Sequence, residues 1–70
     1  MTKLISFSLN GQHYCVKSRV NIFEILQYFH FKNLFFILEY NSVICNKEEW
    51  KKTDIQDNDC IEIITIVGGG

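Results

Sequence analysis

The last fourteen residues, 57–70, read DNDCIEIITIVGGG, and this stretch decides how the rest of the chain is interpreted. Residues 60–67 are the most β-prone part of the sequence, because isoleucine and valine fill most of their positions. Acidic and amide residues just before them indicate a turn, and three glycines follow at once. A strand this long and apolar is expected in the middle of a sheet. The stretch therefore predicts a rigid central strand that passes, without a linker, into the flexible tail Gly68-Gly69-Gly70.

The beginning of the chain predicts a β-hairpin. Residues 4–9 alternate between two faces with a period of two, which is typical of a half-buried strand. Asn10-Gly11 follows, and this dipeptide favours a tight turn because both of its positions need a positive φ. Residues 12–17 then resume the alternation and complete the hairpin.

A helix is expected next. Asn21 can accept a hydrogen bond from the first turn, and Glu24 can reach back to complete a capping box. Lys32-Asn33 is expected to end this helix. Apolar residues recur with helical spacing and predict one core-facing stripe: Ile22, Ile25, Leu26 and Phe29.

The remaining segments predict further strands. Phe35 to Tyr40 is rich in aromatic and apolar residues and is expected to be buried on both faces. Residues 43–45 form a short strand, and Asn46 is expected to cap a single helical turn that ends at Trp50. The order β-β-α-β-β-β predicts an α+β fold, with a mixed sheet of four to five strands and one main helix on one face. We expect a single domain over residues 1–67 and a tail over residues 68–70.

The composition excludes several classes of protein. The chain has 70 residues, of which 47% are hydrophobic, so it is one small domain and not a disordered chain. Its net charge of -1 does not provide the positive field that a nucleic-acid binder needs. The longest apolar run, residues 34–38, is too short to span a bilayer, and the first residues lack a secretory signal. We therefore expect no nucleic-acid or membrane partner, and a monomer when the chain is free.

Residue usage adds a clue to the source. The chain contains no alanine, no proline and one arginine, Arg19, which is the preference of an AT-rich genome. Three consecutive glycines run against this bias, so we infer that the tail is retained for a function. The same bias suggests an organelle genome or a low-GC bacterium. The expected location is therefore the cytoplasm, or the plastid stroma if an organelle genome encodes the chain.

The groups that could suggest a metal or a nucleophile are better explained as structural. Three cysteines lie far apart without a CxxC pair, so reduced thiols buried in strands are expected and no metal site or dithiol is supported. Cys15 near His13 is interpreted in the same way. The acidic segment before the last strand lacks the glycine and distal glutamate of a calcium loop. We expect a solvated turn there, at Asp54, Asp57, Asn58 and Asp59.

A glycine tail on a rigid strand has a chemical use. Without side chains it can enter a narrow channel and adopt backbone angles closed to other residues. Its carboxylate can be activated as an acyl adenylate and then attacked by a nucleophile, while a partner enzyme provides positioning and electrostatic stabilisation. Gly70 is thus the expected reactive residue, and Gly68 and Gly69 give access to it.

The whole chain resembles the ThiS family of sulfur carrier proteins, which have the ubiquitin-like β-grasp fold. The resemblance rests on the Asn10-Gly11 turn, the helix residues 22–26, the segment from Val43 to Trp50, and above all the ending. An acidic turn, a strand and Val-Gly-Gly-Gly form a common end in that family. Asn58 stands where many relatives carry glycine, a small departure that a turn tolerates.

The resemblance implies a carrier that is not itself an enzyme and binds no cofactor of its own. A ThiF-like adenylyltransferase would use ATP to adenylate the Gly70 carboxylate. A sulfur donor such as a cysteine desulfurase system would convert it to a thiocarboxylate. Thiazole synthase (ThiG) would then take the sulfur for the thiazole ring of thiamine.

Other functions remain open at this point. The small subunit of molybdopterin synthase shares the fold and the ending. A ubiquitin-like modifier would instead form isopeptide bonds with target lysines. A plain β-grasp interaction module would carry its glycines only as a frayed end.

A partner surface is expected on the sheet face that the helix leaves uncovered. Apolar residues exposed there would need a partner to explain them. The candidates are Leu4, Tyr14, Ile64 and Ile66.

Overall fold

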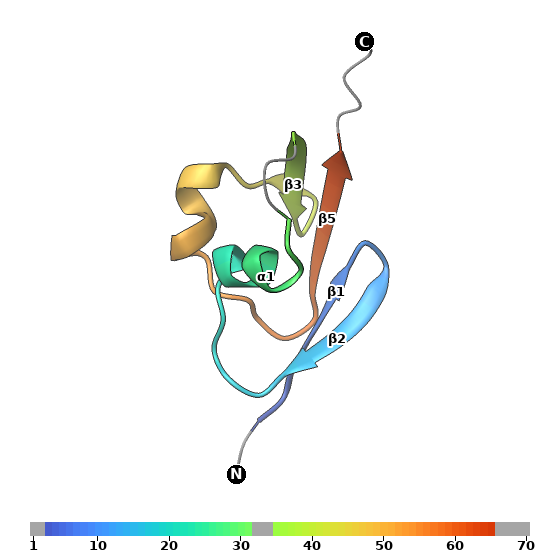
Figure 1. The fold of residues 1–70 in the computed structure, drawn as a ribbon. Helices are drawn as coiled ribbons and strands as arrows, with labels where there is room; N and C mark the ends of the chain where they lie inside the picture. The colour runs from blue at the N-terminus through green and yellow to red at the C-terminus, as the bar shows by residue number, and fades with distance from the viewer. Residues whose placement is uncertain (1–2, 32–34, 66–70) are drawn as a thin grey trace.

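The computed structural model describes residues 3–31 and 35–65 (Figure 1). The glycine tail therefore lies outside the described residues. The described residues form β1 (Ile5–Leu9), β2 (Gln12–Val16), α1 (Ile22–Tyr28), β3 (Phe36–Tyr40), β4 (Val43–Ile44), the 3₁₀ helix η1 (Lys47–Lys52) and β5 (Asp59–Thr65).

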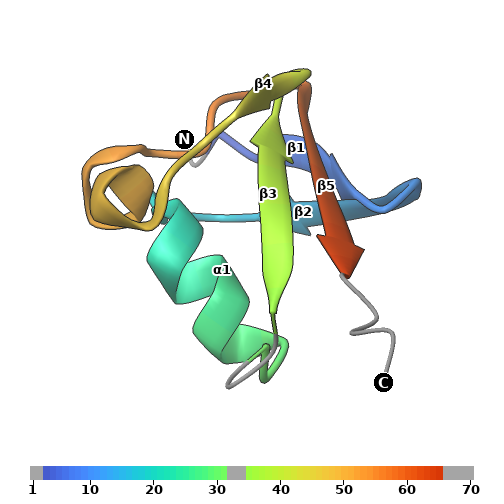
Figure 2. The ribbon, with the colours of Figure 1, turned by 90° about the horizontal axis from the view of Figure 1, so that it is seen from above.

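The strands form one mixed sheet in the order β2-β1-β5-β3-β4. β5 lies in the middle, parallel to β1 and antiparallel to β3. α1 and η1 lie on the same side of this sheet (Figures 1 and 2). The predicted fold class, the element order and the central place of the last strand are confirmed.

In the described part of the chain, no helix is both long and apolar enough to cross a membrane.

The hairpin and the start of the helix follow the sequence closely. Asn10 and Gly11 have φ values of 51° and 85°, so both adopt the left-handed conformation that the turn requires. At the helix start, the Asn21 side chain accepts a hydrogen bond from the Glu24 amide at 2.8 Å. The Glu24 carboxylate accepts one from the Asn21 amide at 2.9 Å, which completes the predicted capping box.

The helix ends earlier than predicted. Its last residue is Tyr28, not a residue near Lys32-Asn33. His30 takes a left-handed conformation with φ of 62°. The amides of His30 and Phe31 donate to the carbonyls of Gln27 and Leu26 at 3.1 and 2.9 Å. This pair of bonds is a Schellman ending, built here without the glycine that usually marks it in a sequence.

Two other local predictions were wrong. β3 is not buried on both faces: Leu38 is buried, but Ile37 on the opposite face is 36% exposed, because the single helix covers only one side. Asn46 precedes η1 as expected, but its side chain makes no capping hydrogen bond. Its backbone carbonyl accepts from the Glu49 amide at 2.8 Å instead.

The core lies between the inner face of the sheet and α1. The segment after η1 is tied to the helix start, since the Ile22 amide donates to the Thr53 carbonyl at 3.0 Å and the Ile55 amide donates to the Val20 carbonyl at 2.8 Å. The buried apolar side chains are Phe7, Leu9, Ile22, Ile25, Leu26, Leu38, Ile55, Ile61 and Ile63.

Candidate functional site

The C-terminal end of β5 is the place where the sequence predicts the working tail to begin. β1 pairs with β5 as far as Leu9, which lies opposite Ile61. Asn10 then continues the pairing: its amide donates to the Ile61 carbonyl at 2.9 Å, and its side-chain oxygen accepts from the Ile63 amide at 2.8 Å. On the other side, β3 stays paired with β5 as far as Thr65. The strand is thus held on both sides almost to the end of the described residues.

The tail itself lies beyond this point. Gly68, Gly69 and Gly70, and also Ile66 of the expected partner surface, are outside the described residues. Their roles stay predictions. What the structure adds is the base of the tail: β5 is the central strand of the sheet and is anchored by its neighbours (Figure 1).

At its other end, β5 starts with a buried carboxylate. Asp59 is 7% exposed and accepts hydrogen bonds from the Tyr40 hydroxyl, from the Asn41 side-chain amide at 3.0 Å and from the Gln56 backbone amide at 2.6 Å. Burial, together with the hydrogen bond to Asp59, raises the pKa of the Tyr40 hydroxyl, so this group keeps its proton to a higher pH than an exposed tyrosine does. The expectation of a solvated turn was wrong for Asp59, because its two oxygens organise the surrounding loops.

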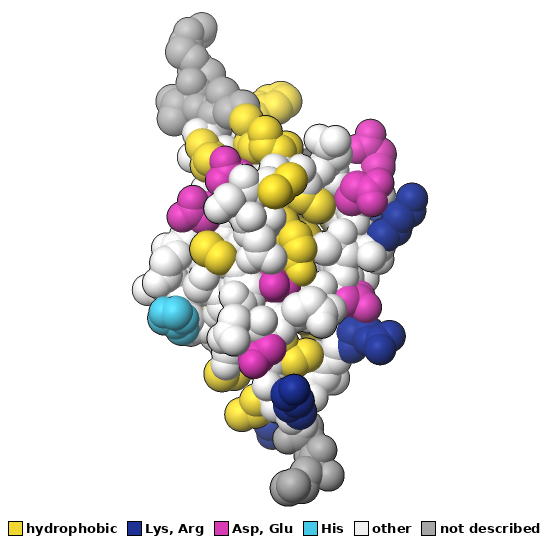
Figure 3. Space-filling view, turned by 180° about the vertical axis from the view of Figure 1, so that it is seen from behind, with side chains coloured by type: hydrophobic (Ala, Val, Ile, Leu, Met, Phe, Trp, Pro, Cys, Tyr) yellow, Lys and Arg dark blue, Asp and Glu magenta, His cyan; other side chains and the backbone are white. Residues whose placement is uncertain are grey.

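The sheet face away from α1 carries exposed apolar side chains near the end of β5. Ile64 is 46% exposed and lies directly opposite Ile37 of β3, while Ile44 of β4 is 60% exposed. In the view from behind (Figure 3), hydrophobic side chains gather toward the end where β5 finishes, with acidic side chains next to them. The Lys and Arg side chains lie lower and along the right-hand side of that view.

The structure separates the predicted partner-surface residues. Leu4 is 52% exposed, and Ile64 is exposed on the uncovered face, as the prediction requires. Tyr14 was wrongly assigned to that face: its ring packs against Phe29 of α1, with centroids 5.0 Å apart, and it lies beside the core. Side chains alternate between the two faces of β2, so Tyr14 points toward α1 while its neighbours His13 and Cys15 point to the opposite face. Binding by Leu4 and Ile64 stays a prediction.

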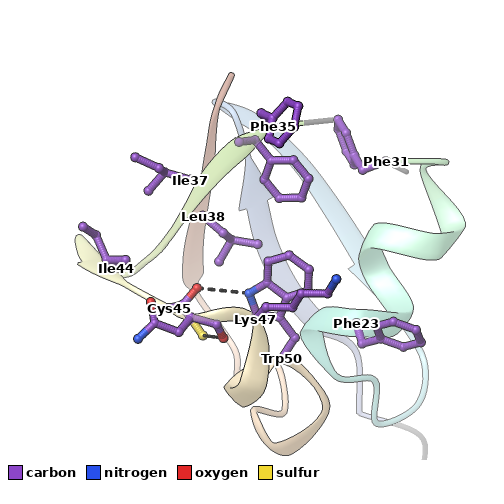
Figure 4. A pocket seen from close by; sticks show the side chains of 11 residues that line it. Phe23, Phe31, Phe35, Ile37, Leu38, Ile44, Cys45, Lys47 and Trp50 are labelled. Atoms are coloured by element: carbon purple, nitrogen blue, oxygen red, sulfur yellow. Dashed lines mark hydrogen bonds between the residues drawn. The ribbon is translucent and has the colours of Figure 1, made fainter. Parts of the chain in front are cut away.

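Sequence reasoning missed Ile37, Ile44 and Glu39 on the same face. Ile37 and Ile44 point away from α1 (Figure 4). Glu39 lies opposite Glu62 of β5 and also opposite Ile44 of β4. The alternation within Phe36–Tyr40 was a usable signal for which residues face outward. Their cross-strand partners depend on register, which the sequence alone does not fix.

The cysteines are more exposed than expected. Cys15 and Cys60 are exposed, because each occupies an outward-facing position in the alternation of β2 or β5, although cysteine is usually buried. Cys45 is half-buried. In the described residues, the Cys15 sulfur is within hydrogen-bond distance of the Ser6 hydroxyl, at 3.4 Å. In residues 3–31 and 35–65, no group of His, Cys, Asp or Glu is arranged to hold a metal ion.

A pocket of about 470 Å³ lies between α1, β3 and η1 (Figure 4). Trp50 stacks on Phe36 with their ring centroids 5.6 Å apart, and its indole N–H donates to the Cys45 carbonyl at 3.0 Å. Trp50 thus packs against the edge of the core. The lining of the pocket is mainly aromatic and aliphatic, so we interpret the pocket as a gap in the packing at the edge of the sheet.

Comparison with known proteins gives a consistent result. The model of the ThiS family matches residues 7–70, which include the glycine tail. The structure is similar to a crystal structure of the thiamine biosynthesis protein (ThiS) from Geobacter metallireducens, with a TM-score of 0.79. That match covers 94% of this chain and 100% of the other, at 23% sequence identity, and it shows the shared fold.

Curated relatives are similar along their whole length. The uncharacterized protein ycf40 of Trieres chinensis is 48% identical over 73 residues, with 100% of both chains covered. The uncharacterized protein ycf40 of Porphyra purpurea is 34% identical over 70 residues, covering 100% of this chain and 99% of the relative.

Proposed function

The chain belongs to the ThiS family, and from this premise we propose that it is a sulfur carrier whose reactive group is the carboxylate of Gly70. The observation that carries the proposal is the junction between β5 and the tail. A strand that is held by the β1 side as far as Ile63 and by β3 as far as Thr65 is followed by Gly68-Gly69-Gly70, which begins three residues after Thr65. The family match extends over the same glycines.

The chemistry follows from the properties of such a tail. A Gly70 carboxylate oxygen attacks the α-phosphate of ATP in a ThiF-like adenylyltransferase, and pyrophosphate leaves. The terminal sulfur of a persulfide, formed by a cysteine desulfurase system, then attacks the acyl adenylate and displaces AMP. A thiol reduces the resulting acyl disulfide, which releases the thiocarboxylate and leaves a disulfide on the donor side. The chain acts as a cosubstrate, while its partners supply positioning and stabilise the developing charge.

The pathway is the finer part of the proposal. We assign the thiocarboxylate sulfur to thiazole synthase (ThiG) and the thiazole ring of thiamine. The family supports a ThiS-like carrier, but the curated relatives are uncharacterized. Disruption of the reading frame should make growth depend on added thiamine. A strain that thiamine does not rescue, and that lacks molybdoenzyme activity, would move the carrier to the molybdopterin pathway.

We place the protein in the plastid stroma. Its relatives carry the name ycf40, which denotes plastid-encoded reading frames, and its residue usage fits an AT-rich genome.

Intact-protein mass spectrometry tests the carrier chemistry. After incubation with ATP, the ThiF-like enzyme and the sulfur donor, the chain should gain the mass difference between sulfur and oxygen. One extra alanine after Gly70 should abolish the change without altering the melting temperature, because the carboxylate then sits on a residue with a Cβ. An extra alanine before Met1 is the matched control and should still be converted. Equal conversion of both extended chains would refute the assignment of Gly70.

A further inference from the structure

Five side chains on the uncovered sheet face, Ile37, Ile44, Ile64, Glu39 and Glu62, form one surface that we call the acidic-apolar face. Ile37 lies opposite Ile64, and Glu39 lies opposite Glu62 two positions along the same strands. Ile44 lies opposite Glu39 on the β4 side, so the face has two rows: Ile37 with Ile64, and Ile44 with Glu39 and Glu62. Thr65, where β5 ends, directly follows Ile64, so this surface adjoins the base of the tail.

The two glutamates are unfavourably placed for the isolated domain. Residues directly opposite in an antiparallel pair have Cβ atoms about 5 Å apart, and like charges at this spacing repel. Glu39 is half-buried between Glu62 and Ile44, which limits how far it can turn into water. The ion pair found in the described residues joins Arg19 to Asp54, so it does not relieve this repulsion. Threonine or lysine at either position would suit the sheet better.

The arrangement limits what can cover the face. A second copy of the chain would bring four carboxylates together, so self-association is disfavoured. A nucleic acid or an anionic membrane surface would be repelled by the same charges. An apolar surface alone would cover the isoleucines but would leave Glu39 and Glu62 desolvated and unpaired. A protein with an apolar centre and a basic side chain beside it satisfies both rows.

We propose that the acidic-apolar face docks the tail-activating enzyme, whose apolar side chains cover Ile37, Ile44 and Ile64 and whose arginine or lysine bridges Glu39 and Glu62. This inference rests on the proposed sulfur-carrier function. A guanidinium can donate to two carboxylates at once, which makes arginine the better fit. The fold thus holds two like charges in register until the basic residue of the partner arrives between them.

The test uses steady-state adenylation of the carrier by the ThiF-like enzyme. In Glu39→Gln/Glu62→Gln, two neutral side chains of the same shape replace the carboxylates. We expect KM for the carrier to rise at least about 10-fold with kcat nearly unchanged, because the tail chemistry is untouched while docking weakens. The dependence of KM on salt should also become shallower.

A matched control removes the same charge elsewhere. Glu48→Gln/Glu49→Gln neutralises two exposed carboxylates on η1, away from the acidic-apolar face, and should leave KM within about 2-fold of wild type. An equal rise in both double variants would mean that only net charge matters, and would overturn the proposal. An unchanged KM in the Glu39/Glu62 variant would also overturn it.

Glu62→Lys separates docking from folding. It places an opposite charge across from Glu39, so the melting temperature should rise while KM increases further. A variant that is less stable, or that binds as well as wild type, would contradict the proposal. A wild-type dimer that the two glutamine substitutions strengthen would instead assign the face to a second copy.

These results are distinguishable from failure of the proposed function. If the wild-type chain is adenylated and the Glu39/Glu62 variants behave like it, only the docking surface is wrong. If the wild-type chain is not adenylated at all, the sulfur-carrier proposal fails, and the docking inference fails with it.

Discussion

The two ends of β5 treat charge and apolar surface in opposite ways. At its start, Asp59 is buried and its carboxylate is fully engaged with groups of the same chain. Toward its end, Ile64 is exposed, and at its midpoint Glu62 faces another glutamate across the sheet. The first arrangement stabilises the domain by itself. The second is unfavourable for the isolated domain, and we propose that a partner covers it, so that one part of the strand serves the fold and another the proposed function.

The largest effect that tests this comparison comes from truncating isoleucines on the two faces of β5. Ile61 is fully buried, so Ile61→Ala should lower the free energy of unfolding by about 4 kcal/mol through lost burial and a residual cavity. Ile64→Ala should cost less than about 1 kcal/mol, because that side chain is already half exposed. Urea denaturation followed by circular dichroism measures both. Equal losses would show that the end of β5 is as important for folding as its start.

The carboxylates sharpen the comparison with a smaller effect. Asp59→Ala should cost about 2–3 kcal/mol, because it leaves the hydrogen-bond donors of Tyr40, Asn41 and Gln56 without their acceptor. Glu62→Ala should change stability by less than about 0.5 kcal/mol and in the stabilising direction, since it relieves like-charge repulsion. The same urea experiment decides; a clear loss of stability for Glu62→Ala would contradict the assigned division of roles.

The smallest effect concerns pH at the start of β5. Because burial and Asp59 raise the pKa of Tyr40, the folded chain keeps this proton above pH about 10, where the unfolded chain releases it. The unfolded state then binds fewer protons, so the free energy of unfolding falls as pH rises above that value. Tyr40→Phe should cost about 1 kcal/mol at neutral pH and flatten the alkaline decline. Parallel declines in both proteins would show that other groups cause it.

Most of the fold could be predicted because local signals agreed with one another. The Asn10-Gly11 turn, the capping box at Asn21 and the long apolar strand each specify their own conformation, and all three are consistent with one order of elements. The helix end was missed because its Schellman turn uses His30, whose left-handed conformation has no strong sequence signal.

The site was only partly predictable. The proposed reactive tail follows directly from the glycines, whereas the face formed by Ile37, Glu39, Ile44, Glu62 and Ile64 depends on contacts between distant strands. The pairing of Glu39 with Glu62 is set by the register of β3 on β5, which the sequence does not state. Tyr14 was misplaced for a related reason, since its apolar character fits either face and the sequence does not state which face of β2 packs against α1.

The parallel pairing of β1 with β5 has a mechanical consequence. A partner that draws the tail into a channel pulls β5 along its own axis. The hydrogen bonds to β1 and β3 are perpendicular to this force, so they are loaded in shear and must break together, not one after another. An enzyme that holds the tail, as proposed above, would therefore pull on the domain without separating β5 from its neighbours, and the acidic-apolar face would keep its shape.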